Sequence, residues 1–234
     1  MGTASIRHRH MLSAVDRMQV KICGVRTREA AQAAAEHGAS AVGFVFAASP
    51  RRVTPKQAAR LAAYLPASVA TVAVFRHPTE RELKEVLDEF PPDLVQVEPG
   101  PAAESATGAG FRLLPVLHDG PELLGQLSSL VPTHRSGILL EAPGRGGRGI
   151  RADWSRAGRL ADRVPLVLAG GLTPTNVTRA IREVRPAAVD VSSGVESRPG
   201  HKDPGLIRDF IRTALAAERE IEPRPASSRF VFKS

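Results

Sequence analysis

The chain has 234 residues, of which 42% are hydrophobic and 24% are charged, a balance typical of a soluble globular protein with a large core. Its net charge of +8 would suit a nucleic-acid or membrane surface. However, the arginines are spread along the chain without a basic run or interleaved aromatic residues, which argues against nucleic acid and favours a small anionic ligand. No apolar run reaches the roughly 18 residues of a membrane span, so we expect no membrane contact.

The two ends of the chain differ in composition from the region between them. Residues 1–18 lack the apolar core of a signal peptide, and we expect a flexible tail there rather than a metal site at Arg7-His8-Arg9-His10. Residues 219–234 become rich in proline, serine and charge, and we expect a second flexible tail. The one cysteine, Cys23, cannot form a disulfide within the chain, which indicates a reducing compartment and a cytoplasmic protein.

Between the tails, residues 19–218 alternate short apolar runs with helix-like stretches, as expected for one domain. The runs cover residues 20–23, 41–46, 71–75, 94–97, 113–117, 137–140, 166–169 and 188–191. Most of them do not alternate apolar with polar residues, which is typical of parallel strands buried on both faces. The pattern predicts an α/β fold, an eight-stranded parallel β/α (TIM) barrel; a doubly wound open sheet is the alternative that the count of eight disfavours.

Several helices have recognisable starts. The segment 27–37 begins with a threonine N-cap, and Thr54-Pro55 supplies an N-cap followed by proline at the first helical position. Thr173-Pro174 repeats that arrangement, and Asp153 is expected to cap a helix that begins at Trp154. The segment 99–110, rich in alanine and glycine, has the weakest helical pattern.

Reactive groups of a β/α barrel lie where strands end and the following loops begin. This rule selects Cys23 after the first strand, Arg51 after the second, Glu98 after the fourth and Glu141 after the sixth. All of them are predicted to face one mouth of the barrel. Taken alone, a lone cysteine such as Cys23 is more often a small buried apolar residue, and Arg51 could equally be a solvated loop arginine like Arg52.

Two glycine-rich segments, 168–172 and 189–194, follow the last two strands. Glycines let a backbone approach a ligand closely, and successive N–H groups at a loop or helix start favour anions. We therefore expect a phosphate cup made by Gly170, Gly171, Ser192, Ser193 and Gly194. Asp190 is expected to orient a loop or cap backbone groups near the phosphate, because two negative charges would repel.

The string GRGGRG at residues 144–149 could be mistaken for a nucleic-acid-binding segment, but it is short and solitary. A mobile active-site lid is the better interpretation, since glycines supply flexibility and arginines face an anionic ligand. We count Gly147 of this lid among the substrate-binding residues.

Several of these motifs occur together in one known family. KICG at 21–24, VGFVF at 42–46, SPR at 49–51, GGRG at 146–149 and DW at 153–154, together with the two glycine-rich segments, resemble phosphoribosylanthranilate isomerase in order and spacing. The likeness runs from about residue 20 to about residue 211, so chance is a poor explanation for it.

The resemblance implies an Amadori rearrangement in tryptophan biosynthesis, by an intramolecular oxidoreductase of the aldose–ketose isomerase type that needs no cofactor and no metal. The substrate would be N-(5-phosphoribosyl)anthranilate and the product 1-(2-carboxyphenylamino)-1-deoxyribulose 5-phosphate. By the same resemblance Cys23 is the general base, Glu141 occupies the place of the general acid, and Arg51 holds the anthranilate carboxylate. Monomer is the default oligomeric state.

The chain departs from the family pattern around the mouth. Glu141 stands where the family has aspartate, and a displacement of ~1 Å can cost ~10²-fold in rate. Glu98-Pro99 replaces the usual histidine and glycine, 149–152 lacks the usual lysine, threonine and phenylalanine, and the segment before Ser49 is one residue short. Two hypotheses follow: a working isomerase, or a divergent phosphosugar-binding barrel with lost or altered activity.

Overall fold

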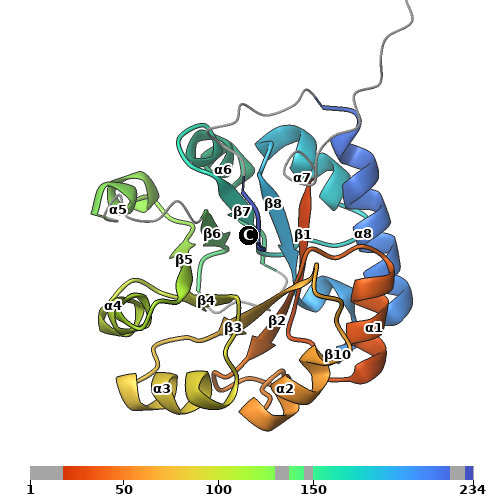
Figure 1. The fold of residues 1–234 in the computed structure, drawn as a ribbon. Helices are drawn as coiled ribbons and strands as arrows, with labels where there is room; N and C mark the ends of the chain where they lie inside the picture. The colour runs from red at the N-terminus through yellow and green to blue at the C-terminus, as the bar shows by residue number, and fades with distance from the viewer. Residues whose placement is uncertain (1–17, 130–136, 145–149, 222–229, 234) are drawn as a thin grey trace, which may run out of the picture.

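A computed structural model describes residues 18–129, 137–144, 150–221 and 230–233. Eight parallel strands close into a barrel in the order β1 to β8, which confirms the predicted fold class (Figure 1). The strands are β1 (Gln19–Cys23), β2 (Ala41–Val45), β3 (Ala70–Val74), β4 (Leu94–Val97), β5 (Arg112–His118), β6 (Ile138–Glu141), β7 (Leu166–Leu168) and β8 (Ala188–Val191).

A ring of helices surrounds the barrel in Figure 1. The helices are α1 (Arg28–Glu36), α2 (Pro55–Ala62), α3 (Glu80–Glu89), α4 (Pro101–Gly108), α5 (Leu123–Ser129), α6 (Trp154–Ala161), α7 (Val177–Val184) and α8 (Pro204–Glu218). A 3-10 turn, η2 (Ser193–Val195), and a hairpin of β9 (Glu196–Arg198) and β10 (His201–Lys202) follow β8. Within the described ranges, no helix has both the length and the apolar character needed to cross a membrane.

Three predicted helix starts are confirmed, and one is displaced. Thr27 and Asp153 accept hydrogen bonds from backbone N–H groups in the first turns of their helices, and Thr54 forms a full capping box. The prediction of a helix opening at Thr173-Pro174 is wrong, because α7 begins only at Val177. The Asn176 side chain explains the delay, since it binds the backbone at both Thr173 and Gly171 and holds this stretch in a turn.

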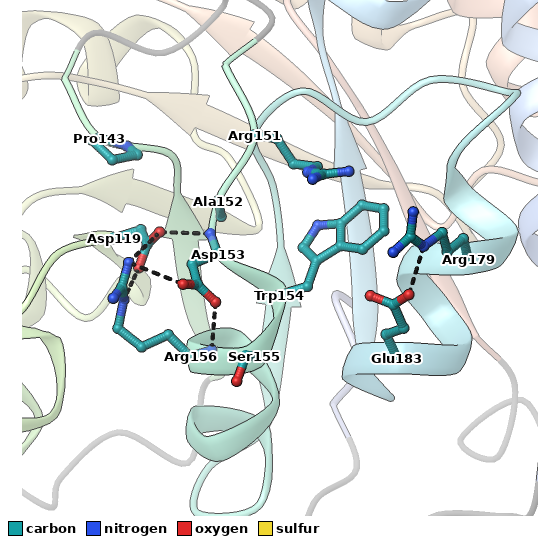
Figure 2. Close-up of a pocket in the computed structure, with 10 residues that line it drawn as sticks. All are labelled: Asp119, Pro143, Arg151, Ala152, Asp153, Trp154, Ser155, Arg156, Arg179 and Glu183. Carbon is teal, nitrogen blue, oxygen red and sulfur yellow. Dashed lines mark hydrogen bonds and ion pairs between the residues drawn. The ribbon is translucent and has the colours of Figure 1, made fainter.

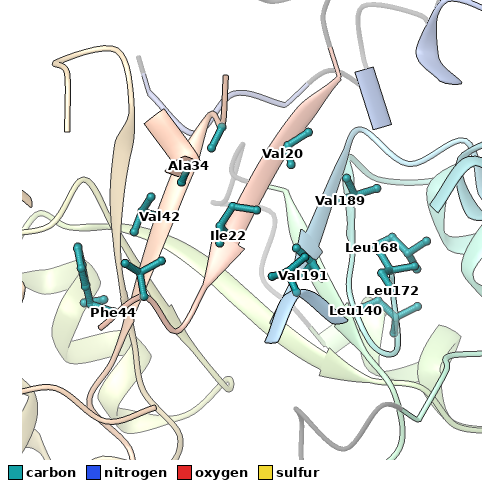
Figure 3. Packing of buried hydrophobic residues seen from close by; sticks show 14 of the residues in the cluster. Val20, Ile22, Ala34, Val42, Phe44, Leu140, Leu168, Leu172, Val189 and Val191 are labelled. Atoms are coloured by element: carbon teal, nitrogen blue, oxygen red, sulfur yellow. The ribbon is translucent and has the colours of Figure 1, made fainter. Parts of the chain in front are cut away.

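The strands separate two apolar layers. Val20, Ile22, Val42 and Phe44 face outward and pack under the helices in the outer core of Figure 3. Alternate positions face inward, where small and branched residues fill the barrel. Because side chains alternate along β1, Lys21 lies on the inner side between two outward-facing apolar neighbours.

The lower opening of the barrel, where the strands begin, is filled by residues 230–233, which we call the lower segment. Phe230 and Phe232 are 4% and 0% exposed, and their ring centroids lie 4.7 Å apart in an edge-to-face arrangement. The Arg112 guanidinium donates hydrogen bonds of 3.0 Å to the carbonyl oxygens of Phe232 and Val231. Figure 1 places the end of the described chain at the centre of the ring.

This packing differs from the flexible tail that the sequence predicts over 219–234. The lower segment packs because its two aromatic side chains bury apolar surface that would otherwise meet water at the base of the barrel. Its neighbours include Gly137, where a Cβ would lie 2.9 Å from the Phe230 ring. Residues 1–17, 222–229 and 234, which also belong to the predicted tails, lie outside the described residues.

Candidate active site

A cavity of about 380 Å³ lies at the upper mouth, where the strands end. Six residues that the sequence singles out line it together: Cys23, Arg51, Glu98, Glu141, Asp190 and Ser192. They come from β1, the loop after β2, the loop after β4, the end of β6, and β8 with its loop. The strand-end rule thus places these groups correctly around one mouth.

The remaining phosphate-cup residues lie in the loops beside this cavity rather than in its lining. Gly170 and Gly171 have φ values of 85° and 63°, a left-handed backbone that favours glycine. A Cβ at Gly194 would overlap the carbonyl oxygen of Leu172, so the loops after β7 and β8 touch. The two glycine-rich segments are therefore neighbours, as predicted. Gly147 and the lid residues 145–149 lie outside the described residues.

A buried lysine lies beneath the candidate base. The Lys21 ammonium is 2.9 Å from Asp190 Oδ1, and both side chains are almost fully enclosed. Burial alone lowers the pKa of Lys21, but the Asp190 carboxylate and the Cys23 sulfur raise it above its ordinary value. Within the described ranges, Asp190 thus binds an ammonium group rather than the backbone groups that the sequence suggests. Lys21 lies two residues before Cys23, so strand alternation could have predicted its inward orientation.

The Cys23 thiol lies in a buried and positively charged place. Burial raises its pKa, and the ammonium groups of Lys21 and Lys202 lower it only in part, so the pKa lies above its ordinary value. Gly43 leaves the necessary room, because a Cβ there would lie 3.1 Å from the Cys23 sulfur and 3.2 Å from Lys21 Nζ. The residue is therefore a protonated thiol at neutral pH, next to cations that stabilise its thiolate.

Arg51 is held by a carboxylate from the hairpin that follows η2. Its Nε and Nη2 donate hydrogen bonds of 2.8 Å to the two oxygens of Glu196, and Lys202 lies 2.7 Å from the same carboxylate. Arg51 is only 8% exposed, which excludes the solvated-loop alternative. Burial raises the pKa of Glu196, but Arg51 and Lys202 bring it below its ordinary range. Glu196 lies two residues beyond the second glycine-rich segment, and nothing in the sequence pairs it with Arg51, 145 residues away.

Glu141 ends β6 and lines the same cavity. Burial raises the pKa of its carboxyl group, and nearby Asp190 raises it further, while His118 and Lys21 oppose the shift. Next to it, Gln96 Oε1 and Glu98 Oε2 are buried side-chain atoms that accept no hydrogen bond within the part of the chain that the structure describes. Both residues line the cavity, so they offer acceptors to a bound hydroxyl group.

Beyond the mouth, a second pocket of about 460 Å³ lies beside α6 and α7 (Figure 2). Arg151 stacks on the Trp154 ring at 4.5 Å from its centroid. On the other side of the pocket, Asp119 accepts hydrogen bonds of 2.6 Å from the Asp153 N–H and from Arg156 Nε. This carboxylate joins the end of β5 to the start of α6.

Fold and site together define a β/α barrel with candidate acid and base groups at its upper mouth. The chain belongs to the N-(5'-phosphoribosyl)anthranilate isomerase family, whose model matches residues 20–213. The N-(5'-phosphoribosyl)anthranilate isomerase of Listeria monocytogenes serotype 4b (strain F2365) is 40% identical over 206 residues, which cover 86% of this chain and all of that protein. The isomerase of Geobacter sulfurreducens is 40% identical over 204 residues.

Solved structures of the same family resemble this chain in fold. The phosphoribosyl anthranilate isomerase of Thermotoga maritima superposes with a TM-score of 0.75 and 37% identity, covering 84% of this chain and 98% of that one. A phosphoribosyl anthranilate isomerase in complex with reduced 1-(o-carboxyphenylamino)-1-deoxyribulose 5-phosphate gives a TM-score of 0.72 and 35% identity over the same shares. The lower segment at 230–233 lies outside the residues that the family model matches.

Proposed function

We propose that this protein converts N-(5-phosphoribosyl)anthranilate into 1-(2-carboxyphenylamino)-1-deoxyribulose 5-phosphate, the isomerase step of tryptophan biosynthesis. Membership of the family supports the reaction. The observation that carries the proposal is the single cavity that Cys23 and Glu141 share, with the Arg51 guanidinium at its edge. This isomerisation requires one acid and one base within reach of the same sugar.

In the proposed mechanism, the Glu141 carboxyl protonates the ring oxygen of the ribose, and the ring opens to an iminium ion. The Cys23 thiolate then removes the proton from the neighbouring carbon, C2, to give an enolamine. This enolamine ketonises when C1 regains a proton, so atoms and electrons balance without an oxidant or a reductant. Lys21 and Lys202 supply the positive field that stabilises the thiolate.

The rest of the substrate would be held by groups around the same cavity. Backbone N–H groups of the two touching glycine-rich loops would bind the phosphate. Arg51 borders the cavity and would attract the anthranilate carboxylate, with Glu196 fixing its orientation. Gln96 and Glu98 would accept hydrogen bonds from the ribose hydroxyls, since each has a buried oxygen available.

The pKa directions define the pH dependence. The reactive state needs protonated Glu141 and deprotonated Cys23, although the carboxyl loses its proton at lower pH than the thiol. The profile of kcat/KM against pH should therefore be bell-shaped, with the acid limb reporting Glu141 and the basic limb reporting Cys23. Only a minor fraction of the enzyme is in the reactive state at the optimum.

Loss of substrate fluorescence tests the proposal directly. Cys23→Ser should lower kcat by on the order of 10³-fold, and Glu141→Ala by on the order of 10²-fold, because each removes one proton-transfer group. Glu141→Asp shows whether the site is built around the longer side chain, in which case turnover falls. Wild-type protein that binds the substrate but does not exceed its spontaneous decay would instead be a phosphosugar-binding barrel.

Two finer properties complete the proposal. We propose a monomer as the default state. One solved structure is of monomers generated from a phosphoribosylanthranilate isomerase of Thermotoga maritima that is itself described as dimeric. Light scattering coupled to gel filtration distinguishes the two states. The place of the chain is the cytoplasm, where the unpaired Cys23 stays reduced.

A further inference from the structure

Three consecutive strands end in ionisable side chains on the same side of the mouth. Glu98 follows β4, His118 ends β5 and Glu141 ends β6; we call them the β4–β6 row. His118 and Glu141 are register partners on adjacent parallel strands, so their side chains leave the sheet in the same direction. His118 Nε2 lies 3.4 Å from Glu98 Oε1. An imidazole thus lies between two carboxyl groups, one of which is the proposed acid.

We propose that His118, held by Glu98, is a positioning residue that fixes the place and the protonation of the Glu141 carboxyl group. The inference rests on the proposed function of Glu141 and extends it to His118, which has no role so far, and to the Glu98 oxygen that faces it. It is carried by the register pairing and by the Glu98–His118 contact, both of which belong to the described barrel.

The backbone beneath His118 is anchored on both sides. The N–H of the next residue, Asp119, donates a hydrogen bond of 2.8 Å to the carbonyl oxygen of Glu141. The Asp119 carboxylate in turn holds Arg156 and the N–H of Asp153 at the start of α6 (Figure 2). His118 therefore projects from a segment with little freedom to move, as a residue that orients a neighbour must.

His118 acts on the Glu141 carboxyl group through its positive charge. The hydrogen bond with Glu98 raises the pKa of His118, so the ring stays protonated to higher pH than a free histidine. The resulting positive charge lowers the pKa of Glu141, against burial and against the charges of Asp190 and Glu98. Lys21 from β1 adds to the same lowering. His118 is thus the cation on the neighbouring strand that limits how far burial raises the pKa of this carboxyl group.

Glu98 also meets groups from the loop after β3. Arg76 Nε and His77 Nδ1 lie 3.8 and 3.9 Å from its two oxygens. Burial raises the pKa of Glu98, but the hydrogen bond with His118 and the charge of His77 bring it below its ordinary value. Glu98 therefore remains ionised and can hold the imidazolium. His77 is mostly exposed and does not line the cavity that contains Glu141, which makes it a matched control.

The test compares pH profiles of variants at these two histidines. His118→Asn should move the acid limb of kcat/KM to higher pH by up to about one unit, because Glu141 loses a neighbouring positive charge. KM should change less than kcat. His118→Lys, which restores the charge, should return the limb toward its wild-type position. His77→Asn should leave the limb in place. A lower kcat in His118→Asn with an unmoved acid limb would show a purely structural role and overturn the proposal.

A second measurement does not need turnover. In protein labelled with ¹³C at the glutamate carboxyl carbon, the Glu141 resonance should titrate at higher pH in His118→Asn than in wild type, and Glu98→Gln should lower the pKa read from the His118 ring protons. Unchanged titrations of both groups would refute the inference even if the enzyme is active. Shifted titrations in a protein without turnover would leave the β4–β6 row intact and refute the isomerase mechanism instead.

Discussion

The two ends of the barrel use opposite chemistry on the same eight strands. At the upper mouth, buried charges are held in close pairs, Lys21 with Asp190 and Arg51 with Glu196. At the lower end, Phe230 and Phe232 fill the opening with apolar surface. A paired buried charge costs desolvation and is retained for function, whereas buried aromatic rings stabilise directly. The comparison separates residues that shape reactivity from residues that hold the barrel closed.

The largest expected effect is at the upper end. Lys21→Met leaves the Asp190 carboxylate buried without its ammonium partner and should lower the free energy of unfolding by about 3–5 kcal/mol. Turnover should also be lost, because the Cys23 thiolate loses its nearest cation. Denaturant unfolding with a parallel activity assay measures both. Lys21→Met combined with Asp190→Leu should recover part of the stability but no activity; a double variant as unstable as the sum of the singles would contradict this account.

At the lower end, Phe232→Ala should lower the free energy of unfolding by about 3–5 kcal/mol, through lost burial and the cavity that remains. Unlike Lys21→Met, it should leave kcat/KM within about twofold of wild type, because the lower face of a β/α barrel carries stability. Thermal and denaturant unfolding give the first value. Tyr64→Ala is the matched control, since this ring is exposed and contacts only Arg28 among the described aromatic and cation contacts. A large fall in turnover in Phe232→Ala would show that the lower end also shapes reactivity, and would contradict the separation.

Gly43→Ala sharpens the same comparison with one methyl group. The new Cβ would press on the Cys23 sulfur and Lys21 Nζ, at 3.1 and 3.2 Å, and should cost about 1–3 kcal/mol of stability while lowering kcat. Gly108→Ala is the control, because no atom lies within 4 Å of a Cβ at that position. Equal effects of the two substitutions on kcat would show that the space above β2 is not critical.

The reactivity of the one cysteine reports the electrostatic balance of the mouth. Because burial raises the pKa of Cys23, the thiolate fraction should grow about tenfold per pH unit through the neutral range. Alkylation by iodoacetamide, followed by mass spectrometry, should accelerate with the same slope. A rate that levels off near neutral pH would show that Lys21 and Lys202 outweigh burial.

The smallest effect concerns the edge of the lower segment. Lys233 Nζ lies 2.6 Å from Asp93 Oδ1, but both side chains are partly exposed, so Lys233→Ala should cost at most about 1 kcal/mol. Burial raises the pKa of Asp93, yet hydrogen bonds from Lys233 and Thr71 bring it below its ordinary value. This contribution is present above the unfolded pKa of Asp93 and is lost as pH falls through the folded pKa. Unfolding at neutral and acidic pH, with and without high salt, checks it; a penalty that persists in acid would rule out the ion pair.

Much of the molecule follows from local patterns. Eight apolar runs and their helix caps predict the barrel. The strand-end rule and the glycine-rich segment after β8 gather six residues around one cavity: Cys23, Arg51, Glu98, Glu141, Asp190 and Ser192. These inferences succeed because parallel strands place their carboxyl ends at one face, whatever the spacing in sequence.

Other features depend on contacts that no local pattern encodes. Arg51 and Glu196 are 145 residues apart in the chain, and Glu98 meets His118 only because adjacent strands align at that height. The packing of the lower segment could not be predicted from composition, because Phe230 and Phe232 follow a stretch rich in proline, serine and charge. The start of α7 shifted because Asn176 satisfies a turn before the helix begins.

The lower segment has a kinetic consequence. Its contact with Arg112 joins residues 120 positions apart, so forming it closes a long loop whose entropy must be lost before the contact contributes. We expect these contacts to be absent from the folding transition state, so that changes in them accelerate unfolding and leave the folding rate almost unaltered. The residues at the base of the barrel thus determine how long a folded molecule survives, and have little influence on how quickly it is made.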